Sequence, residues 1–332
     1  MAKPKIAFVT GGYSSEAVIS YKSAVTIENN INLDLFDAYR IDITPQKWFH
    51  VSADKTEIEV DKNDFTLTIN GDKIIFDAVL IGIHGTPGED GKLQGYFDLI
   101  NLPYTSCDAS TSAITFNKRY TCAIAGSSGF HVAKSILLFK SNYNEELSFV
   151  SALSFPVFVK PNNGGSSIGI SKVNSINDLP TAIKKAFLED NQVLVEEFIK
   201  GREFTIGVFE SKGKIITLPF TEIITENEFF DFEAKYEGKS LEVTPAECSP
   251  ETATAVQTAA TGIYSLFNCR GVVRMDFIFN EDDRKPYLLE INTVPGQSAA
   301  SIVPQQVAAM GLDLKSFYTT LIEGALSAKT KK

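Results

Sequence analysis

The segments GVVRMDFIFN (271–280) and PYLLEINT (286–293) lie close together near the end of the chain and decide the fold of that region. In the first segment, Arg274 and Asp276 alternate with apolar residues, so they should lie on one face of a strand. The other face should carry the apolar residues Val273, Met275, Phe277 and Phe279. The polar stretch between the two segments is short enough for an antiparallel connection. The two segments therefore predict a β-hairpin with one charged face.

The second segment brings further polar groups to the same face of this hairpin. Glu290 and Asn292 alternate with Leu289 and Ile291, which we expect to face the core. Asp276, Glu290 and Asn292 can then converge, and oxygen ligands of this kind suit Mg²⁺, which leaves coordination positions to water and substrate phosphates. An alternative stays open from the pattern alone, because strands often carry charge on a solvent-facing side, where the carboxylates would only pair with cations.

The composition is that of an ordinary soluble globular protein. The chain has 332 residues, of which 44% are hydrophobic and 22% charged, and this length predicts two or three domains. The net charge of −10 and a pI near 5.0 argue against a nucleic-acid surface, which needs clustered Lys and Arg in excess. The N-terminal segment has no apolar stretch long enough for a signal peptide or a membrane span, so we expect a cytoplasmic protein without a membrane partner.

The cysteines carry no recognisable metal or redox motif. Cys107, Cys122, Cys248 and Cys269 lack CxxC spacing, which argues against a zinc site and against a disulfide framework. We expect reduced thiols.

Strand and helix patterns divide the chain into three parts. The first alternates strands and helices and predicts a small doubly wound α/β domain with a parallel sheet. The second mixes strands and helices as a compact α+β unit. The third begins with two long strands, 202–211 and 214–224, and continues with a helix over 250–267, the hairpin and two terminal helices. The predicted domains are residues 1–106, 107–195 and 196–332.

A glycine-rich segment, VKPNNGGSSIG (159–169), follows a predicted strand. Its glycines and serines can present backbone N–H groups and hydroxyls to phosphate oxygens, with Lys160 supplying positive charge. It matches neither the Walker A loop nor the dinucleotide fingerprint. On its own it is a weak signal, and an ordinary glycine-rich hairpin loop is the commoner interpretation of such a segment.

Two strand-to-helix junctions in the first domain are candidate ligand sites. IHGTPGEDG (83–91) follows a buried-type strand and ends where a helix begins, which is where α/β folds place ligands. There His84 is either a ligand residue or a satisfied loop histidine, and the acidic pair after it either binds a ligand or caps the helix. In GGYSSEAVIS (11–20), Glu16 lies in the first turn of a helix, where a carboxylate caps the helix or binds an ammonium group.

The segment FFDFEAKYEGKS (229–240) mixes aromatic residues with alternating charge. It is read either as a mobile loop carrying Lys235 and Tyr236 over a site or as a surface excursion.

Taken together, in this order, the motifs resemble the D-alanine–D-alanine ligase family of the ATP-grasp superfamily, over nearly the whole chain from 11 to 304. The resemblance implies a three-domain ATP-grasp fold in which the central and C-terminal domains clasp ATP between two sheets. Some segments depart from the family pattern: FNK (116–118) replaces the commoner MDK, Phe97 and Asp98 stand for Leu and Glu, and PGQSAAS (295–301) replaces a PGMT-type segment. The last borders the pocket of the second substrate.

The site residues follow from the resemblance, motif by motif. It implies that ATP is bound by Lys118, Lys160, Ser166, Ser167, Glu196, Glu197, Phe198, Ile199, Glu203 and Lys235. It implies two Mg²⁺ (or Mn²⁺) ions held by Asp276, Glu290 and Asn292, with Glu290 bridging them. Around the first D-alanine it places Glu16, His84 and Ser166, and around the reacting carboxylate and the second D-alanine it places Arg274, the backbone of Gly296 and Ser301. The implied catalytic residues are Glu16, Ser166, Tyr236, Arg274 and Ser301.

The activity expected from the resemblance is ATP-dependent ligation of two D-alanines through a D-alanyl phosphate, in a homodimer. Rivals within the class are ligases that join D-alanine to D-lactate or D-serine, or other ATP-grasp carboxylate–amine ligases; Tyr236 favours the dipeptide. A rival from another class is a regulatory protein that binds nucleotide without chemistry. Arg274 counts against it, because binding ATP alone does not require an oxyanion residue.

Overall fold

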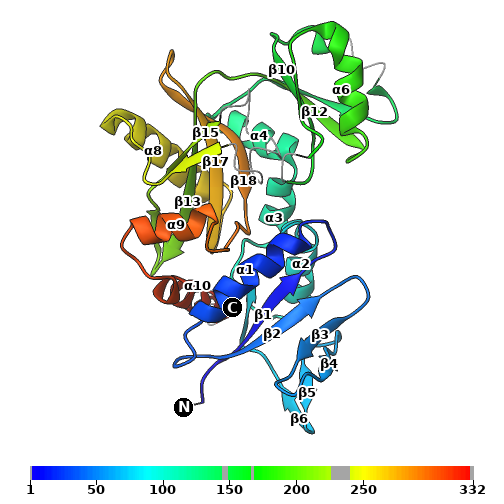
Figure 1. Ribbon diagram of the computed structural model, residues 1–332, viewed down its shortest axis with the longest axis vertical. Coiled ribbons are helices and arrows are strands. Elements are labelled where there is room, and N and C mark those ends of the chain that lie inside the picture. Colours follow the sequence, from blue (N-terminus) through cyan, green and yellow to red (C-terminus); the bar gives the residue numbers. More distant parts are fainter. Residues whose placement is uncertain (1, 144–148, 166–167, 226–239, 330–332) are drawn as a thin grey trace.

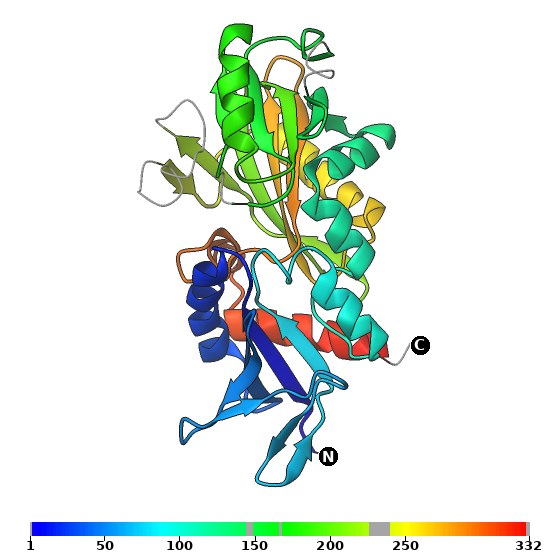
Figure 2. The ribbon, with the colours of Figure 1, turned by 90° about the vertical axis from the view of Figure 1, so that its right-hand side faces the viewer.

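The computed structural model describes residues 2–143, 149–165, 168–225 and 240–329. The molecule is elongated, with an N-terminal sheet at one end, a small sheet at the other and a large sheet between them (Figures 1 and 2). Within the described residues, no helix is both long enough and apolar enough to span a bilayer.

The N-terminal sheet has the strand order β4-β3-β2-β1-β7. Its central strands β2, β1 and β7 are parallel, as predicted, but β3 and β4 add to it antiparallel, so the sheet is mixed. A separate β5–β6 hairpin lies beside it. The strands are β1 (Lys5–Gly11), β2 (Asp37–Ile43), β3 (Trp48–Val51), β4 (Glu57–Glu59), β5 (Leu67–Ile69), β6 (Asp72–Ile74) and β7 (Ala78–Ile81).

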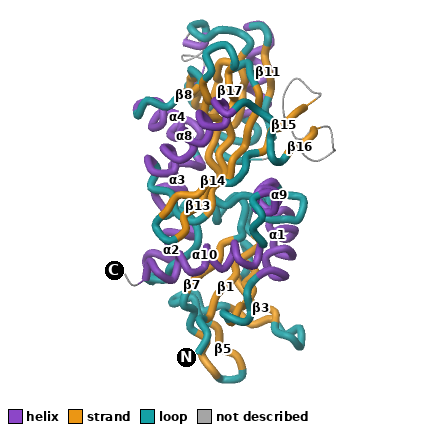
Figure 3. Tube along the Cα trace, turned by 90° about the vertical axis from the view of Figure 1, so that its left-hand side faces the viewer, coloured by secondary structure: helices purple, strands orange, loops and turns teal. Residues whose placement is uncertain are grey.

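Both faces of the N-terminal sheet are covered. Ile6 and Phe8 of β1 pack in one core cluster with α1 (Ala17–Asn30) and α10 (Leu314–Lys329), and α10 lies across β1 and β7 (Figure 3). Ala7 and Val9 point to the opposite face, where they pack in a second cluster with α2 (Lys92–Leu99). Because apolar side chains alternate along β1, helices pack on both faces of the sheet. One of these helices, α10, comes from the C-terminal end of the chain.

The small sheet is antiparallel, with the order β11-β10-β12-β9, and α6 packs on it. Its β10 leads into the glycine-rich segment, and its β12 leads towards the large sheet. The elements are β9 (Ser135–Phe139), β10 (Val157–Pro161), β11 (Ser171–Val173), η1 (Ile176–Asp178), α6 (Leu179–Ala186) and β12 (Gln192–Glu197).

The large sheet has the order β16-β15-β13-β17-β18-β8, and β14 pairs with part of β13. Helices α3, α4 and α8 pack against one hydrophobic core on this sheet, and α9 contacts its central strand β13. The elements are α3 (Ala109–Phe116), α4 (Lys118–Ser127), β8 (His131–Val132), β13 (Arg202–Ser211), β14 (Lys214–Thr217), β15 (Thr221–Thr225), β16 (Ser240–Val243), α8 (Pro250–Leu266), β17 (Val272–Asn280), β18 (Lys285–Asn292) and α9 (Ile302–Ala309).

Three helices pack on a sheet that belongs to another part of the chain. Helices α3 and α4 follow residue 106 yet pack on the large sheet, and α10 returns to the N-terminal sheet. The domain limits at residues 106 and 196 stay a prediction.

Two strand predictions need correction. The segment 214–224 is two strands, β14 and β15, because the chain breaks around Pro219, which has no N–H for a strand ladder. In β18 the pairing with β17 shifts after Asp276, so that Leu288 faces Phe277 and is buried, whereas Leu289 is only half-buried. A β-bulge therefore turns Leu288, and not Leu289, into the core.

Candidate active site

The hairpin predicted from the sequence is formed by β17 and β18. Its register pairs Arg274 with Asn292 and Asp276 with Glu290. Directly opposite residues of an antiparallel pair share a face, so these four side chains form one polar face of the large sheet.

Arg274 is held by carboxylates on this face. Its Nε and Nη2 atoms donate to the two carboxylate oxygens of Asp276 at 3.0 and 2.8 Å, and Nη2 lies 3.8 Å from Oε1 of Glu290. Thr205 of β13 donates a further hydrogen bond to Asp276. Burial by itself would lower the pKa of Arg274, but Asp276, Glu290 and Glu89 together raise it above its ordinary value. The guanidinium is thus a fixed cation beside paired carboxylates.

The oxygen donors of this face fit a hard divalent cation. Asp276 and Glu290 contribute carboxylates and Asn292 an amide oxygen, which already accepts a hydrogen bond from the Val294 backbone at 3.2 Å. Among the residues that the structure describes, no group of three or more His, Cys, Asp or Glu side chains is gathered as a metal site. The donor set therefore depends on the amide of Asn292 or on substrate oxygens, which suits Mg²⁺ or Mn²⁺.

A cavity of about 220 Å³ opens beside Glu290. Lys118, at the start of α4, donates from Nζ to the carbonyl of Gly164 at 2.6 Å and lies 3.5 Å from Oε2 of Glu290. The amine is thereby held between the glycine-rich segment and the polar face. The cavity is lined by Ser14, Ser15, Glu16, Lys118, Pro161, Asn163, Gly164, Gly165, Ile168, Ile170, Glu189 and Glu290.

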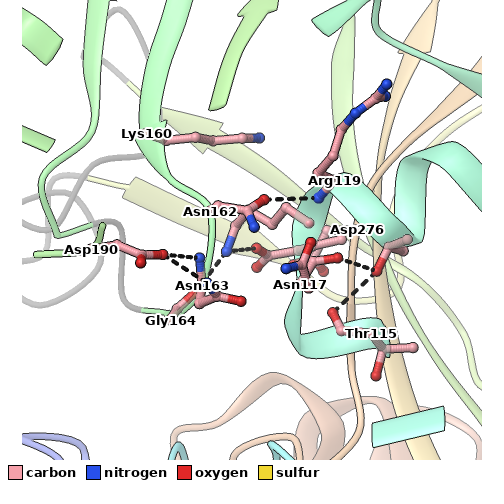
Figure 4. A network of polar contacts seen from close by, with 12 residues as sticks. Thr115, Asn117, Arg119, Lys160, Asn162, Asn163, Gly164, Asp190 and Asp276 are labelled. Atoms are coloured by element: carbon pink, nitrogen blue, oxygen red, sulfur yellow. Dashed lines mark hydrogen bonds and ion pairs between the residues drawn. The ribbon is translucent and has the colours of Figure 1, made fainter. Parts of the chain in front are cut away.

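Two asparagines fix the start of the glycine-rich segment (Figure 4). The side-chain oxygen of Asn162 accepts from the Arg119 backbone at 2.9 Å, and Asn163 donates from both its backbone and its side chain to Asp190 at 2.8 Å. The loop is thus attached to α4 on one side and to the residues before β12 on the other. Ser166 and Ser167, predicted as phosphate ligands, lie outside the described residues.

Lys160 forms a buried ion pair in the small sheet. Its Nζ lies 2.5 Å from Oε1 of Glu196, and both side chains are less than a tenth exposed. Burial would lower the pKa of Lys160, but Glu196 raises it above its ordinary value, so the amine stays charged. Predicted as a phosphate lysine, it is not among the described residues that line the cavity.

The predicted nucleotide segment follows Glu196 at the crossing from the small to the large sheet. Glu197 accepts a hydrogen bond from the Ser154 backbone at 2.8 Å, and the ring of Phe198 packs 5.8 Å from that of Phe158. Ile199 comes next, and Glu203 lies in β13 opposite Ile223 and Ile278. None of the described residues of this segment lines the cavity, and their role in nucleotide binding stays a prediction.

Glu16 reaches from the N-terminal part of the chain to the glycine-rich segment. A Cβ atom at Gly85 would lie 2.5 Å from one carboxylate oxygen of Glu16, and a Cβ at Gly165 would lie 2.7 Å from the other. Both positions must therefore be glycine for this carboxylate to fit between the two loops. Glu16 is brought to the same cavity as Lys118 and Glu290.

His84 lies beside this group but has both ring nitrogens bonded inside the protein. Nδ1 lies 2.7 Å from the carbonyl of Val294, and Nε2 lies 2.9 Å from Oγ of Ser23. Because a carbonyl only accepts, Nδ1 carries the proton and Nε2 accepts from Ser23. The predicted contact of His84 with D-alanine stays a prediction.

Gly296 and Ser301 lie together at the entrance to α9. Oγ of Ser301 accepts from the Ser298 backbone at 3.1 Å, and a Cβ at Gly296 would lie 2.8 Å from that oxygen. Lys235 and Tyr236, predicted on a closing loop, lie outside the described residues.

The sequence reasoning missed Thr205 and the loop contacts of Ser23. Thr205 lies directly opposite Asp276 in the pairing of β13 with β17. Alternation from Glu203 to Thr205 was visible in the sequence, but the register between two strands so far apart in the chain was not. Ser23 gave no signal, because its partners come from segments more than 60 residues away.

Comparisons with known proteins agree over almost the whole chain. A family model described as D-ala D-ala ligase N-terminus matches residues 5–107, and one described as D-ala D-ala ligase C-terminus matches residues 124–323. The chain is 45% identical over 322 residues to the D-alanine–D-alanine ligase of Flavobacterium johnsoniae, and the match covers 97% of this chain and 99% of the relative.

Solved structures of related ligases share the fold. VanG D-Ala:D-Ser ligase from Enterococcus faecalis superposes with a TM-score of 0.88 at 31% identity, covering 97% of this chain and 99% of that one. The D-alanine–D-alanine ligase of Bacillus anthracis, solved complexed with ATP, superposes with a TM-score of 0.76 at 25% identity, covering 99% of each chain. The predicted fold class is thereby confirmed.

Proposed function

We propose, because this chain belongs to the D-alanine–D-alanine ligase family, that it joins two D-alanine molecules into D-alanyl-D-alanine for peptidoglycan precursor synthesis, converting ATP to ADP and phosphate. The observation that carries this proposal is the polar face of the large sheet. There Arg274 and Asn292 lie opposite each other, next to the opposed pair Asp276 and Glu290. A site that only bound nucleotide would not need a half-buried arginine held between carboxylates.

The first step makes the carboxylate of one D-alanine reactive. A carboxylate is a poor electrophile at neutral pH, and transfer of the γ-phosphoryl group of ATP converts it to an acyl phosphate. Lys118 and Lys160 supply positive charge for the phosphates, and the backbone around Gly164 provides N–H groups. Asp276, Glu290 and Asn292 would hold two Mg²⁺ or Mn²⁺ ions, which when bound offset the negative charge of the phosphates.

The second step is attack of the amine of the other D-alanine on this acyl phosphate, with phosphate as the leaving group. Arg274 is already aligned by Asp276 and donates its N–H groups to the tetrahedral oxyanion. Glu16, at the N-terminal wall of the cavity, binds and orients the ammonium group of the first D-alanine. No nucleophilic side chain is required.

The rival within the family is D-serine as the second substrate. It is favoured by the likeness to VanG D-Ala:D-Ser ligase and by the unusual PGQSAAS segment at 295–301. We prefer D-alanine, because the Flavobacterium johnsoniae relative, named for D-alanine, is 45% identical, against 31% for VanG.

An assay with a panel of acceptors tests this choice. The purified chain, ATP, Mg²⁺ and D-alanine should release phosphate and give a product with the mass of D-alanyl-D-alanine, and L-alanine should give neither. Adding D-serine or D-lactate in equal amount should leave the D-alanine dipeptide as the main product. Phosphate release without any dipeptide, or a main product containing D-serine or D-lactate, would overturn the proposal.

We further propose that the active form is a cytoplasmic homodimer, as the family resemblance implies. Light scattering of the purified chain should then give twice the mass of the 36.4 kDa chain. A mass of one chain at assay concentrations would contradict this.

A further inference from the structure

A buried hydrogen-bond chain connects the C-terminal helix to His84. The hydroxyl of Tyr318, in α10, donates to Oε1 of Gln297 at 3.0 Å. The backbone N–H of Gln297 donates to Oγ of Ser23 in α1 at 3.1 Å, and Ser23 in turn bonds Nε2 of His84 at 2.9 Å. His84 closes the chain by donating to the carbonyl of Val294 at 2.7 Å.

The hydrogen bonds of this network have one consistent arrangement when His84 is neutral. The carbonyl of Val294 only accepts, so the proton of the neutral imidazole is on Nδ1, and Ser23 donates to Nε2. Its oxygen is then free to accept from the N–H of Gln297. The side-chain amide of Gln297 accepts from Tyr318 and donates from Nε2 to the carbonyl of Pro295 at 3.1 Å. Burial raises the pKa of Tyr318, which keeps its hydroxyl protonated as a donor.

The segment joined in this way is the loop 293–298, which carries Gly296 between β18 and α9. Gln297 is buried, and it stands where the family pattern has the methionine of PGMT, whose thioether is only a weak acceptor for the hydroxyl. A cavity of about 20 Å³, roughly the room of one water, separates the loop from α10 and β7 beside Gln297 and Tyr318. Close packing is therefore interrupted beside Gln297, and there hydrogen bonds add to the packing of the buried Val294 in placing the loop.

We propose that Gln297 and Tyr318 are positioning residues for the D-alanine pockets. They hold the loop 293–298 and His84 in one arrangement, so that α10, which lies on the N-terminal sheet, sets the affinity for D-alanine without touching it. This rests on the proposed ligase function, in which Gly296 and His84 border the D-alanine sites.

The kinetic test uses Tyr318→Phe, Gln297→Met and the double variant. Each single change should raise KM for D-alanine, by roughly three- to tenfold for the one hydrogen bond lost in Tyr318→Phe and by at least as much for the two side-chain bonds lost in Gln297→Met, while KM for ATP stays within about twofold. Because Tyr318 acts through Gln297, the double variant should be no worse than Gln297→Met alone. Additive effects, or an equal rise in KM for ATP, would overturn the proposal.

Tyr264→Phe is the matched control. Tyr264 is also buried and its hydroxyl also donates one hydrogen bond, in this case to the backbone carbonyl of Gly271 at 2.8 Å in the core of the large sheet. Tyr264→Phe should lower the stability of the protein without changing KM for D-alanine. If Tyr318→Phe and Tyr264→Phe have the same kinetic effect, Tyr318 has only a structural role.

Hydrogen–deuterium exchange tests the positioning independently of catalysis. The N–H of Gln297 is a direct reporter, because it donates to Ser23. Tyr318→Phe should speed exchange across 293–298 by at least threefold, and Tyr264→Phe should not. Unchanged exchange would refute the positioning role whether or not the wild-type chain makes the dipeptide, whereas faster exchange in a chain that makes no dipeptide would refute only the ligase function.

Discussion

The carboxylate of Glu290 lies opposite Asp276 and within 4 Å of the cations of Lys118 and Arg274. Glu290→Gln keeps the size of the side chain and removes its charge. We expect phosphate release to fall by about 10²-fold or more, because charge stabilisation by a bound metal is worth several kcal/mol. Phosphate release is measured across a Mg²⁺ titration.

The control for this change is Glu281→Gln, at the exposed turn of the same hairpin, which should leave the rate unchanged. A Glu290→Gln enzyme with a normal rate at saturating Mg²⁺ would remove Glu290 from the metal site.

Lys160 makes a buried ion pair with Glu196, and we propose that it also binds nucleotide. Lys160→Ala should weaken ATP binding, and it should also destabilise the fold by about 3–5 kcal/mol, because Glu196 is left as a buried charge without its partner. Adding Glu196→Gln should restore stability but not ATP affinity. Calorimetric titration with ATP and urea unfolding measure the two effects.

Lys140→Ala, at an exposed residue just after β9, is the comparison variant. It removes one hydrogen bond, to the carbonyl of Phe187 at 3.1 Å, so it should cost less than about 1 kcal/mol and leave ATP affinity unchanged. Unchanged ATP affinity in Lys160→Ala would mean that this lysine serves the ion pair alone.

Arg274 is expected to act in the transition state more than in binding. Removing one preorganised oxyanion donor costs about 10²- to 10³-fold in rate, so Arg274→Ala should fall in or beyond that range under saturating ATP, Mg²⁺ and D-alanine. Arg274→Lys should recover little, since an ammonium cannot reproduce the two parallel bonds that the guanidinium makes to Asp276. Dipeptide formation is measured, with circular dichroism to confirm folding; near-normal turnover in Arg274→Ala would require another oxyanion donor.

Alternation along strands was sufficient to predict which residues share the polar face, because period two is a local property of the chain. It failed at Leu289, because the bulge depends on how β18 pairs with β17 and not on β18 itself. It also could not show that Asp276 meets Thr205 or that His84 meets Val294, since these contacts join segments 71 and 210 residues apart. Motifs predicted the site residues, whereas the partners that these residues have in the structure could be known only from the fold.

At the scale of elements, α9 is attached to the large sheet where the strand ladder is broken. Between β14 and β15, the buried side chain of Gln306 accepts from the N–H of Gly207 at 2.8 Å and donates to the carbonyl of Thr205 at 2.9 Å. A side-chain amide thus replaces the missing strand partner beside the break at Pro219. This fixes α9, and with it Ser301, relative to β13.

Gln306→Ala should therefore destabilise the protein by about 2 kcal/mol or more, because each buried backbone group left unsatisfied costs about 1–3 kcal/mol. Gln305→Ala is the matched control. Gln305 is only half-buried and bonds Glu242 and the carbonyl of Ala300, so its loss should cost less than about 1 kcal/mol. Urea unfolding measures the loss of stability in the two variants. Equal losses would show that the Gln306 amide does not stand in for a missing strand partner of β13.

At the scale of the whole molecule, α10 joins the N-terminal sheet to the large sheet. Its residue Phe317 is fully buried in a core cluster that includes Phe8 of β1 and Phe209 of β13, and its ring packs edge-on 5.3 Å from that of Phe209. The C-terminal helix is thus shared by two layers that the order of the sequence would assign to separate domains. The two layers should unfold together for this reason, although the chain exceeds the size at which a single transition is the rule.

Trp48, the single tryptophan, reports on the N-terminal sheet, where its ring packs against Phe65 and Tyr96. Phe317→Ala removes a large side chain from the shared core and should cost about 3–5 kcal/mol. Because the core joins both layers, the Trp48 fluorescence midpoint in urea should fall, and ligase activity should be lost over the same urea range. Phe149 is 63% exposed, so Phe149→Ala should change neither the Trp48 fluorescence midpoint nor the urea concentration at which activity is lost. A Trp48 midpoint that stays in place while activity is lost earlier would mean that the N-terminal sheet unfolds on its own and that α10 does not couple the layers.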